Sequence, residues 1–207
     1  MVRALGLLLL LSACSGESTD ESDSGPVEPE VFTVALGEPE SCGAYGKVTP
    51  DNAGEVGNWV AGRLTPPAWP ARIDSITGVF DGRVPCTVEI PGKMYVVIAG
   101  ETLPSDFEIR YFGTVPAGSG PGQIITLEIP ELYLDEGEYL YVLSQAEGTE
   151  SAVRCMSLCQ DSDKPDEGWW SDSAEAPYTW STLGSRGDYG AVAVSMTGEA
   201  PIVLPAE

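Results

Sequence analysis

Apolar residues along the chain fall in short runs that Gly, Pro and Asp separate, and most runs are rich in β-branched and aromatic residues. This pattern predicts short β-strands, and no stretch beyond the N-terminal segment keeps a helical period. The runs at residues 94–98 and 139–143 are apolar on both faces, so each predicts a strand that is buried on both sides. The predicted strands are Val31–Ala35, Asn58–Leu64, Arg72–Phe80, Thr87–Ile90, Met94–Ala99, Phe107–Phe112, Gln123–Ile129, Glu138–Ser144, Ala152–Met156, Tyr178–Leu183 and Tyr189–Met196.

The number and spacing of these strands predict an all-β fold. Short strands with turn-rich connections, such as the Gly- and Pro-rich residues 116–122, are typical of sandwiches and barrels. So many strands fit a two-sheet jelly roll more readily than a small barrel. We therefore expect one antiparallel two-sheet β-sandwich over residues 31–207, with a jelly-roll-like topology.

The N-terminal residues have a different pattern. Arg3 precedes an apolar run, Ala4–Leu11, which is shorter than the roughly 20 residues that span a bilayer but suits the core of a signal peptide. The run ends in Leu-Ser-Ala-Cys at residues 11–14, which resembles the lipobox of bacterial lipoproteins. That resemblance implies a signal peptide over residues 1–13, cleavage before Cys14, and lipid on the sulfur and amine of Cys14. An unlipidated signal peptide or a buried strand is the alternative.

Residues 14–30 predict a tether between the lipid and the domain. Beyond Cys14 the segment is acidic, contains no basic residue, and has too few apolar residues to offset the entropy of ordering. An acidic cation-binding arm is the alternative. Ser15 follows the lipidated cysteine and, by resemblance to the sorting of Gram-negative lipoproteins, favours the outer membrane. We expect the domain to project from the membrane and to attach to it only through Cys14.

The charge balance excludes several classes of function. Asp plus Glu is 32 against 10 Lys plus Arg, and the net charge of -22 argues against nucleic-acid binding, which needs clustered cations. The absence of His removes Ser-His and Cys-His nucleophile pairs and HExxH zinc proteases. Carboxylates for glycoside hydrolysis are numerous, but no pair is fixed at the required separation.

Two passages carry a second resemblance. Residues 57–70 read GNWVAGRLTPPAWP, and the later passage contains WWSD at 169–172, APYTW at 176–180 and GDYGAVAV at 187–194. Both resemble uncharacterised secreted proteins and lipoproteins of Gram-negative bacteria. The resemblance implies a jelly-roll β-sandwich, a fold that accessory modules of secreted hydrolases also have, and it assigns no functional residue.

Five cysteines are an odd number for an exported protein, and lipidation of Cys14 leaves Cys42, Cys86, Cys155 and Cys159. In an oxidising compartment these four residues predict two disulfides, with three possible pairings. We favour Cys155–Cys159, across a short turn, together with Cys42–Cys86. A zinc site at the Cys155–Cys159 spacing is less favoured because the chain has no His.

Two further groups of residues are candidate binding sites. Asp161, Asp163 and Asp166 lie in an acidic loop whose oxygen atoms suit Ca²⁺, although the spacing is not that of an EF-hand and a solvated loop is the simpler interpretation. No other cofactor is expected. The second group is aromatic and is closely spaced in sequence: Trp169, Trp170, Tyr178 and Trp180, with Asp172 among them.

Exposed aromatic rings stack on sugars, and a nearby carboxylate accepts hydrogen bonds from sugar hydroxyls, so this second group suggests glycan binding. The alternative is that the rings pack on the core. Adjacent side chains on a strand point to opposite faces, so at most one of Trp169 and Trp170 should be exposed.

The sequence thus favours a non-catalytic, lipid-anchored extracytoplasmic protein that is structural or contacts an unknown protein. A carbohydrate-binding module is the first alternative and a carboxylate-based glycoside hydrolase the second. Solvent exposure of the four aromatic residues is the observation that best separates the first two.

Overall fold

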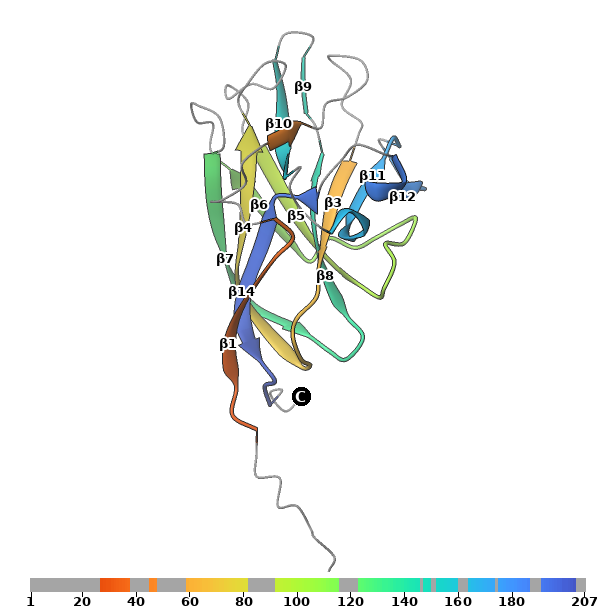
Figure 1. Cartoon of the computed structure of the whole chain (residues 1–207). Helices are drawn as coiled ribbons and strands as arrows, with labels where there is room; N and C mark the ends of the chain where they lie inside the picture. Colours follow the sequence, from red (N-terminus) through yellow and green to blue (C-terminus); the bar gives the residue numbers. More distant parts are fainter. Residues whose placement is uncertain are drawn as a thin grey trace, which may run out of the picture.

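The computed structural model describes residues 27–37, 45–47, 59–81, 92–115, 123–145, 147–149, 152–159, 164–173, 175–186 and 191–203. Within these ranges almost all regular structure is β-strand, in two antiparallel sheets that pack face to face (Figure 1). The expected all-β sandwich is therefore confirmed. The predicted strand Thr87–Ile90 lies outside the described residues.

Eight strands form the sandwich. In the first sheet β4 lies between β14 and β7, and β1 pairs with the other side of β14. The second sheet contains the order β3-β8-β5-β6. The bounds are β1 Glu30–Ala35, β3 Trp59–Leu64, β4 Ala71–Asp81, β5 Gly92–Ala99, β6 Tyr111–Val115, β7 Gln123–Leu134, β8 Tyr139–Gln145 and β14 Val194–Ala200.

This strand order is that of a jelly roll. The antiparallel pairs are nested in the sequence, β5 with β6 innermost, then β4 with β7, β3 with β8 and β1 with β14. Successive pairs fall alternately in the two sheets, as in a long hairpin wrapped around a barrel-like core. The expected topology is confirmed at this level.

The remaining elements extend these sheets. In the segment between β8 and β14, β11 and β12 add to the second sheet beside β3, whereas β10 continues the first sheet from the end of β4 and pairs with β2, β9 and β13. The bounds are β2 Tyr45–Lys47, β9 Glu147–Thr149, β10 Ala152–Cys159, 3₁₀ turn η1 Pro165–Glu167, β11 Gly168–Ser171, β12 Trp180–Thr182, 3₁₀ turn η2 Gly184–Arg186 and β13 Ala191–Val192.

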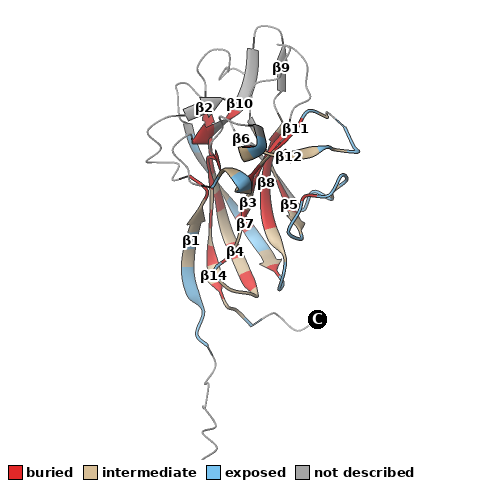
Figure 2. Cartoon of the chain, turned by 45° about the vertical axis from the view of Figure 1, so that its right-hand side comes forward, coloured by how far each residue is buried: buried red, intermediate tan, exposed pale blue. Residues whose placement is uncertain are grey.

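The main core lies between the two sheets and is built by alternation along each strand. On β8 the side chains of Leu140 and Val142 point into this core. On β4 those of Ile73 and Ile76 both do so because the strand register shifts between Ile73 and Ser75. All four are fully buried, and Figure 2 shows buried positions along the facing strands. Burying apolar surface at about 25 cal/mol per Å² is the main term that holds the sheets together.

The central position of the two predicted buried strands is confirmed, although Tyr95 and Ile98 of β5 are only partly buried, and the strand boundaries need correction. β5 and β8 are interior strands of the second sheet, with neighbours on both sides. Strand β6 begins at Tyr111 rather than Phe107, and the last predicted strand is interrupted at Ala193 into β13 and β14. β11 was not predicted, because Trp169 and Trp170 supply little alternation on their own. In the described part of the chain, no helix is long and apolar enough to span a bilayer.

Candidate functional site

The two adjacent tryptophans of β11 point to opposite faces of the second sheet, as predicted. Trp170 lies in the main core with 5% of its surface exposed, and its indole Nε1 donates a hydrogen bond to Asp172 Oδ1 at 2.5 Å. Trp169 lies on the outer face and packs with the second hydrophobic cluster. Trp170 is therefore removed from the glycan-binding candidates because its ring is covered by both sheets, and the exposed carboxylate of Asp172 is paired with that indole.

The outer face of the second sheet carries an aromatic cluster that the sequence analysis recognised only in part. Trp59, on β3, is fully covered and lies 5.1 Å from Tyr95, 5.9 Å from Phe107 and 5.8 Å from Tyr178, measured between ring centroids. Phe107 and Tyr178 stack at 4.8 Å with an interplanar angle of 17°. Trp180 completes the cluster at 5.9 Å from Tyr178. We call these five residues, with Trp169, the outer aromatic cluster.

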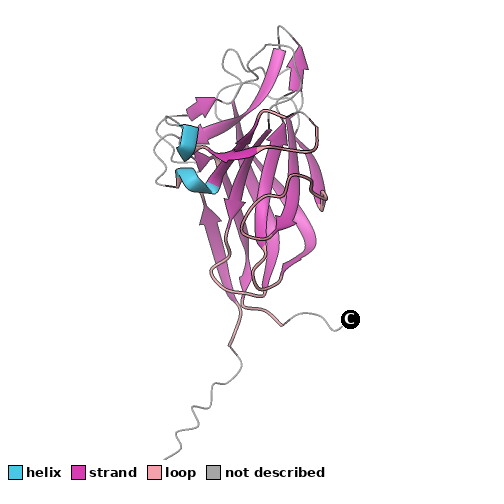
Figure 3. Ribbon diagram, turned by 90° about the vertical axis from the view of Figure 1, so that its right-hand side faces the viewer, coloured by secondary structure: helices cyan, strands magenta, loops and turns pink. Residues whose placement is uncertain are grey.

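Two loops close over this cluster. Residues 100–110 cross the outer face of the second sheet between β5 and β6 (Figure 3). Tyr178 donates its backbone N–H to Ser105 O at 2.6 Å, and the Trp180 indole donates to Pro104 O at 3.0 Å. These bonds fasten the segment before β12 to the loop, so the rings of Tyr178 and Trp180 are half-buried and form no exposed strip.

A polar network borders the cluster. Arg63, two residues after Ala61 on the same face of β3, pairs with Glu167 at 2.5 Å between Nε and Oε2 and donates to Glu101 O at 2.6 Å. Its guanidinium also lies 5.2 Å from the ring centroid of Tyr139. Tyr141 donates its hydroxyl to Gly100 O at 2.9 Å, which holds the start of the covering loop.

Three side chains in and beside this network have raised pKa values. The hydrogen bond to Glu167 raises the pKa of Arg63 above its ordinary value, so this cation stays charged. Burial raises the pKa of Tyr141 to about 12, although the nearby Arg63 cation opposes the rise. Burial also raises the pKa of Tyr178. Neither phenol is suited to act as a base near neutral pH, because both stay protonated there.

One polar atom of the cluster has no acceptor. Trp169 Nε1 is buried, and no hydrogen-bond partner lies within reach of it among the described residues. A buried N–H without an acceptor costs roughly 1–3 kcal/mol. This is the one feature of the cluster that resembles an unfilled binding position.

The calcium candidates are only partly visible. Asp161 and Asp163 lie outside the described residues, and Asp166 is an exposed residue of η1. The carboxylate of the neighbouring Glu167 forms an ion pair with Arg63. Among the described residues no three acidic or cysteine side chains converge as a metal site would require. The calcium hypothesis for Asp161, Asp163 and Asp166 stays a prediction.

The cysteine pairing predicted first is wrong. Cys155 and Cys159 lie on the continuous extended strand β10, where a separation of four residues is about 13 Å. A disulfide requires Cα atoms about 4–7 Å apart. Cys159 is buried and disulfide-bonded. Cys14, Cys42 and Cys86, and the side chain of Cys155, lie outside the described parts, so the two-disulfide count and the Cys42–Cys86 pairing are not decided.

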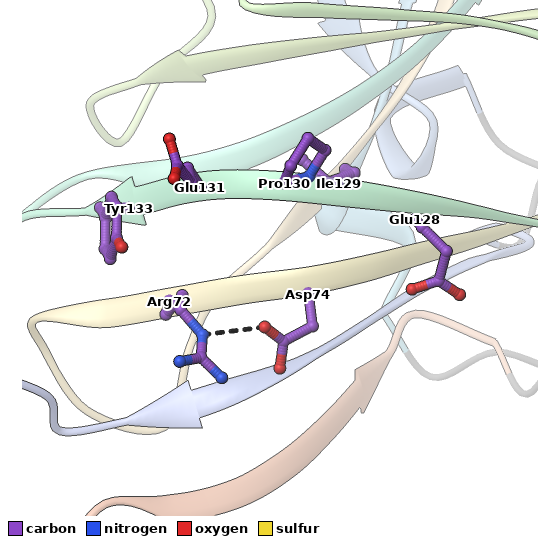
Figure 4. A pocket seen from close by; sticks show the side chains of 7 residues that line it. All are labelled: Arg72, Asp74, Glu128, Ile129, Pro130, Glu131 and Tyr133. Atoms are coloured by element: carbon purple, nitrogen blue, oxygen red, sulfur yellow. Dashed lines mark hydrogen bonds and ion pairs between the residues drawn. The ribbon is translucent and has the colours of Figure 1, made fainter.

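A shallow depression of about 580 Å³ lies on the outer face of the first sheet (Figure 4). Arg72 is its cation, and Asp74 at 2.9 Å and Glu199 at 3.2 Å neutralise it. Figure 4 shows the carboxylates of Glu128 and Glu131 pointing in different directions, not toward a common point. The carboxylate-based glycoside hydrolase stays a prediction.

Comparison with known proteins gives no relative: no family model, no curated protein and no solved structure matches the chain.

Proposed function

We propose that the chain is a lipid-anchored extracytoplasmic protein whose jelly-roll domain is non-catalytic and acts through contacts with other proteins. The lipobox-like residues ending at Cys14 support the anchor, and the acidic segment up to Glu30 supports a spacer. The start of β1 and the end of β14 lie side by side, with Glu30 opposite Ala200, at the end of the sandwich away from β9 and β10 (Figure 1). A tether attached there leaves the rest of the domain directed away from the membrane.

The observation that carries the non-catalytic, protein-contacting proposal is the packing of the outer aromatic cluster. Three of these rings, Trp169, Tyr178 and Trp180, were among the glycan-binding candidates in the sequence. Several other rings surround each of Trp59, Phe107 and Tyr178. The indole N–H of Trp180 donates a hydrogen bond to Pro104 O. Aromatic pairs contribute about 0.5–1.5 kcal/mol each beyond burial, so the cluster is explained by attachment of the covering loops.

Glycan binding is the second candidate, and one observation favours it. The buried Nε1 of Trp169 lacks an acceptor among the described residues, and a sugar hydroxyl that displaced part of a covering loop could supply one. Trp180 and Tyr178 would then be the stacking rings, since both keep part of their surface exposed.

A titration separates the two candidates. Tryptophan fluorescence of the purified full chain is followed while neutral and acidic oligosaccharides are added to millimolar concentration. We expect no saturable change. Saturable binding that Trp180→Ala abolishes and the interior control Trp170→Phe retains would establish the glycan hypothesis and overturn the proposal.

A further inference from the structure

Strand β1 forms one edge of the first sheet, and its backbone leaves hydrogen-bonding groups on the free side. Leu36 N donates to Val194 O at 3.1 Å, and the register continues as Val34 opposite Met196 and Phe32 opposite Gly198. In an antiparallel ladder the alternate residues point the other way. The N–H and C=O groups of Val31 and Thr33 are therefore directed away from β14, and no described strand pairs with them (Figure 2).

The far end of this edge is closed by a side chain. Lys164 Nζ donates a hydrogen bond to Ala35 O at 3.1 Å. After Thr33, Ala35 is the next residue whose carbonyl points away from β14. This bond also confirms the direction in which the odd-numbered carbonyls point. The part of β1 that is open to pairing is thus limited to the residues around Val31 and Thr33. An added strand could pair there over a short length only.

Protection of the β1 edge is confined to its two ends, because Pro29 and Glu30 precede Val31 and Lys164 covers the carbonyl of Ala35. The other edge of the four-stranded part of this sheet, β7, carries Glu128, Pro130 and a positive φ of 54° at Glu131. Charges, proline and irregular backbone are the usual protection against edge pairing. By contrast, β1 reads Glu-Val-Phe-Thr-Val-Ala, with one charge at its start and no proline or bulge. The side chain of Val31 is 74% exposed.

A groove lies beside this edge and would receive a side chain of an added strand. Its volume is about 430 Å³, and it lies at the start of β1, where Val31 and Phe32 line it together with Pro67 and Ala68. The end of β14 closes its other side through Ala200 and Pro201. Phe32 is only partly covered by the main core. In strand addition the backbone gives affinity, and pockets for alternate side chains give specificity.

Charge selects the occupant. Glu28 and Glu30 line the same groove and are exposed, and the chain as a whole has a net charge of -22. A second copy of the chain would bring the same negative charge to the edge, and like charges at an interface disfavour association. An extended segment with basic residues would be attracted to the rim.

We propose that β1 is a docking site for an extended basic segment of another protein, which adds as a strand beside Val31 and Thr33 and places an apolar side chain in the groove at Phe32. This inference rests on the proposed role in protein contacts and gives that role a surface.

The test uses a capped probe peptide, Lys-Val-Lys-Leu-Lys-Val, with the full chain in a neutral detergent. Two peptide controls are the same sequence with alternate backbone amides N-methylated and an analogue with Glu in place of Lys. Peptide affinity is measured by fluorescence anisotropy, and amide hydrogen exchange is measured over residues 30–35. We expect the probe to slow exchange at Val31 and Thr33, and both control peptides to bind about tenfold or more weakly.

The matched variants are Val31→Pro and Val31→Ser. Proline removes an N–H that the native sheet does not use, whereas serine removes the same apolar side chain and keeps the N–H. We expect Val31→Pro to bind the probe about tenfold more weakly than Val31→Ser, the equivalent of one to two hydrogen bonds, with unchanged exchange in β4 and β14.

Several outcomes overturn the inference. One is that the probe does not bind at millimolar concentration. The others are that the two Val31 variants bind the probe equally, or that the acidic analogue binds as tightly as the probe. Concentration-dependent protection of β1 without any probe would make a second copy the occupant. If the chain binds neither the probe peptide nor oligosaccharides, only the docking site on β1 is refuted. If the chain binds oligosaccharides through Trp180, the proposed function is refuted, whatever the result for β1.

Discussion

Gly198 on β14 occupies a position where a side chain would force the backbone to shift. The strand register shifts between Thr197 and Gly198, and a Cβ atom placed on Gly198 would lie 2.1 Å from the carbonyl oxygen of Arg72. That neighbour is backbone of the central strand β4 and cannot rotate away. By contrast, a Cβ on Gly100, in the covering loop, would have nothing within 4 Å.

We predict that Gly198→Ala lowers the free energy of unfolding by about 1–3 kcal/mol, as overpacked core positions do. Gly100→Ala, the matched control, should change it by less than about 0.5 kcal/mol. Urea unfolding followed by tryptophan fluorescence measures both. Equal stability of the two variants would show that the bulge at Gly198 relaxes freely.

The phenol of Tyr141 gives a pH dependence with a definite sign. Its pKa in the folded chain is raised from 10.0 to about 12, with burial as the main cause. Between these values the unfolded chain loses the proton and the folded chain keeps it, so stability falls as pH rises from about 10 to about 12.

Tyr141→Phe should remove part of that fall and should also cost stability at neutral pH, because the hydrogen bond to Gly100 O is lost. Unfolding at a series of alkaline pH values, compared between the two proteins, measures the difference. If the two slopes above pH 10 are equal, Tyr141 titrates like an exposed tyrosine.

The two outward tryptophans make a second matched pair. The indole of Trp180 donates to Pro104 O, whereas that of Trp169 is buried without an acceptor among the described residues. Both Phe variants lose similar volume, but only Trp180→Phe loses a hydrogen bond, worth about 0.5–1.5 kcal/mol. We predict a larger loss of stability and faster amide exchange in residues 100–110 for Trp180→Phe. The reverse order would mean that Trp169 Nε1 has a partner.

The face of the sheet on which a side chain lies was predictable where the alternation of a strand alone determines that face. The opposite directions of Trp169 and Trp170 followed from the two-residue period of a strand. The participation of Trp59 and Phe107 in the same cluster did not. Phe107 reads as the start of a strand, and only the tertiary path of residues 100–110 over the second sheet brings its ring to Tyr178. No local pattern records that crossing.

At the scale of elements, β10 decides which disulfides are possible. The sequence interval from Cys155 to Cys159 reads as a short turn, but pairing of β10 with β4, β2 and β13 keeps the segment extended. Local sequence could not show this, because partners distant in the chain impose the conformation. The central strands β5 and β8 were predictable because their continuous apolar runs need burial on both faces.

We predict that Cys159 is linked to Cys42 or Cys86. Proteolysis of the unreduced, alkylated chain followed by mass spectrometry identifies the linked peptides. A fragment in which Cys155 and Cys159 are joined would contradict the extended conformation of β10, and four alkylatable thiols before reduction would contradict any disulfide in the domain.

The whole molecule has two distinct poles. The start of β1 and the end of β14 lie at one pole, and β9 and β10 reach toward the other (Figure 1). The nested strand pairs explain this, because β1 and β14 are the outermost pair and bring both ends of the chain together. An anchor at Cys14 with an acidic spacer of residues 15–30 would hold the first pole toward the membrane. Anionic headgroups would repel the negative domain within a Debye length of about 8 Å, and the spacer would allow it to stay farther away than that.

The most direct measurement of the central proposal is fractionation of cells that produce the full chain or its Cys14→Ala variant. We predict that the full chain partitions with membranes, that the Cys14→Ala substitution releases the protein into a soluble extracytoplasmic fraction, and that the intact mass of the membrane form exceeds that of the chain beginning at residue 14 by the mass of acyl groups. A Cys14→Ala variant that still partitions with membranes would contradict the account, because the domain would then bind the membrane by its own surface.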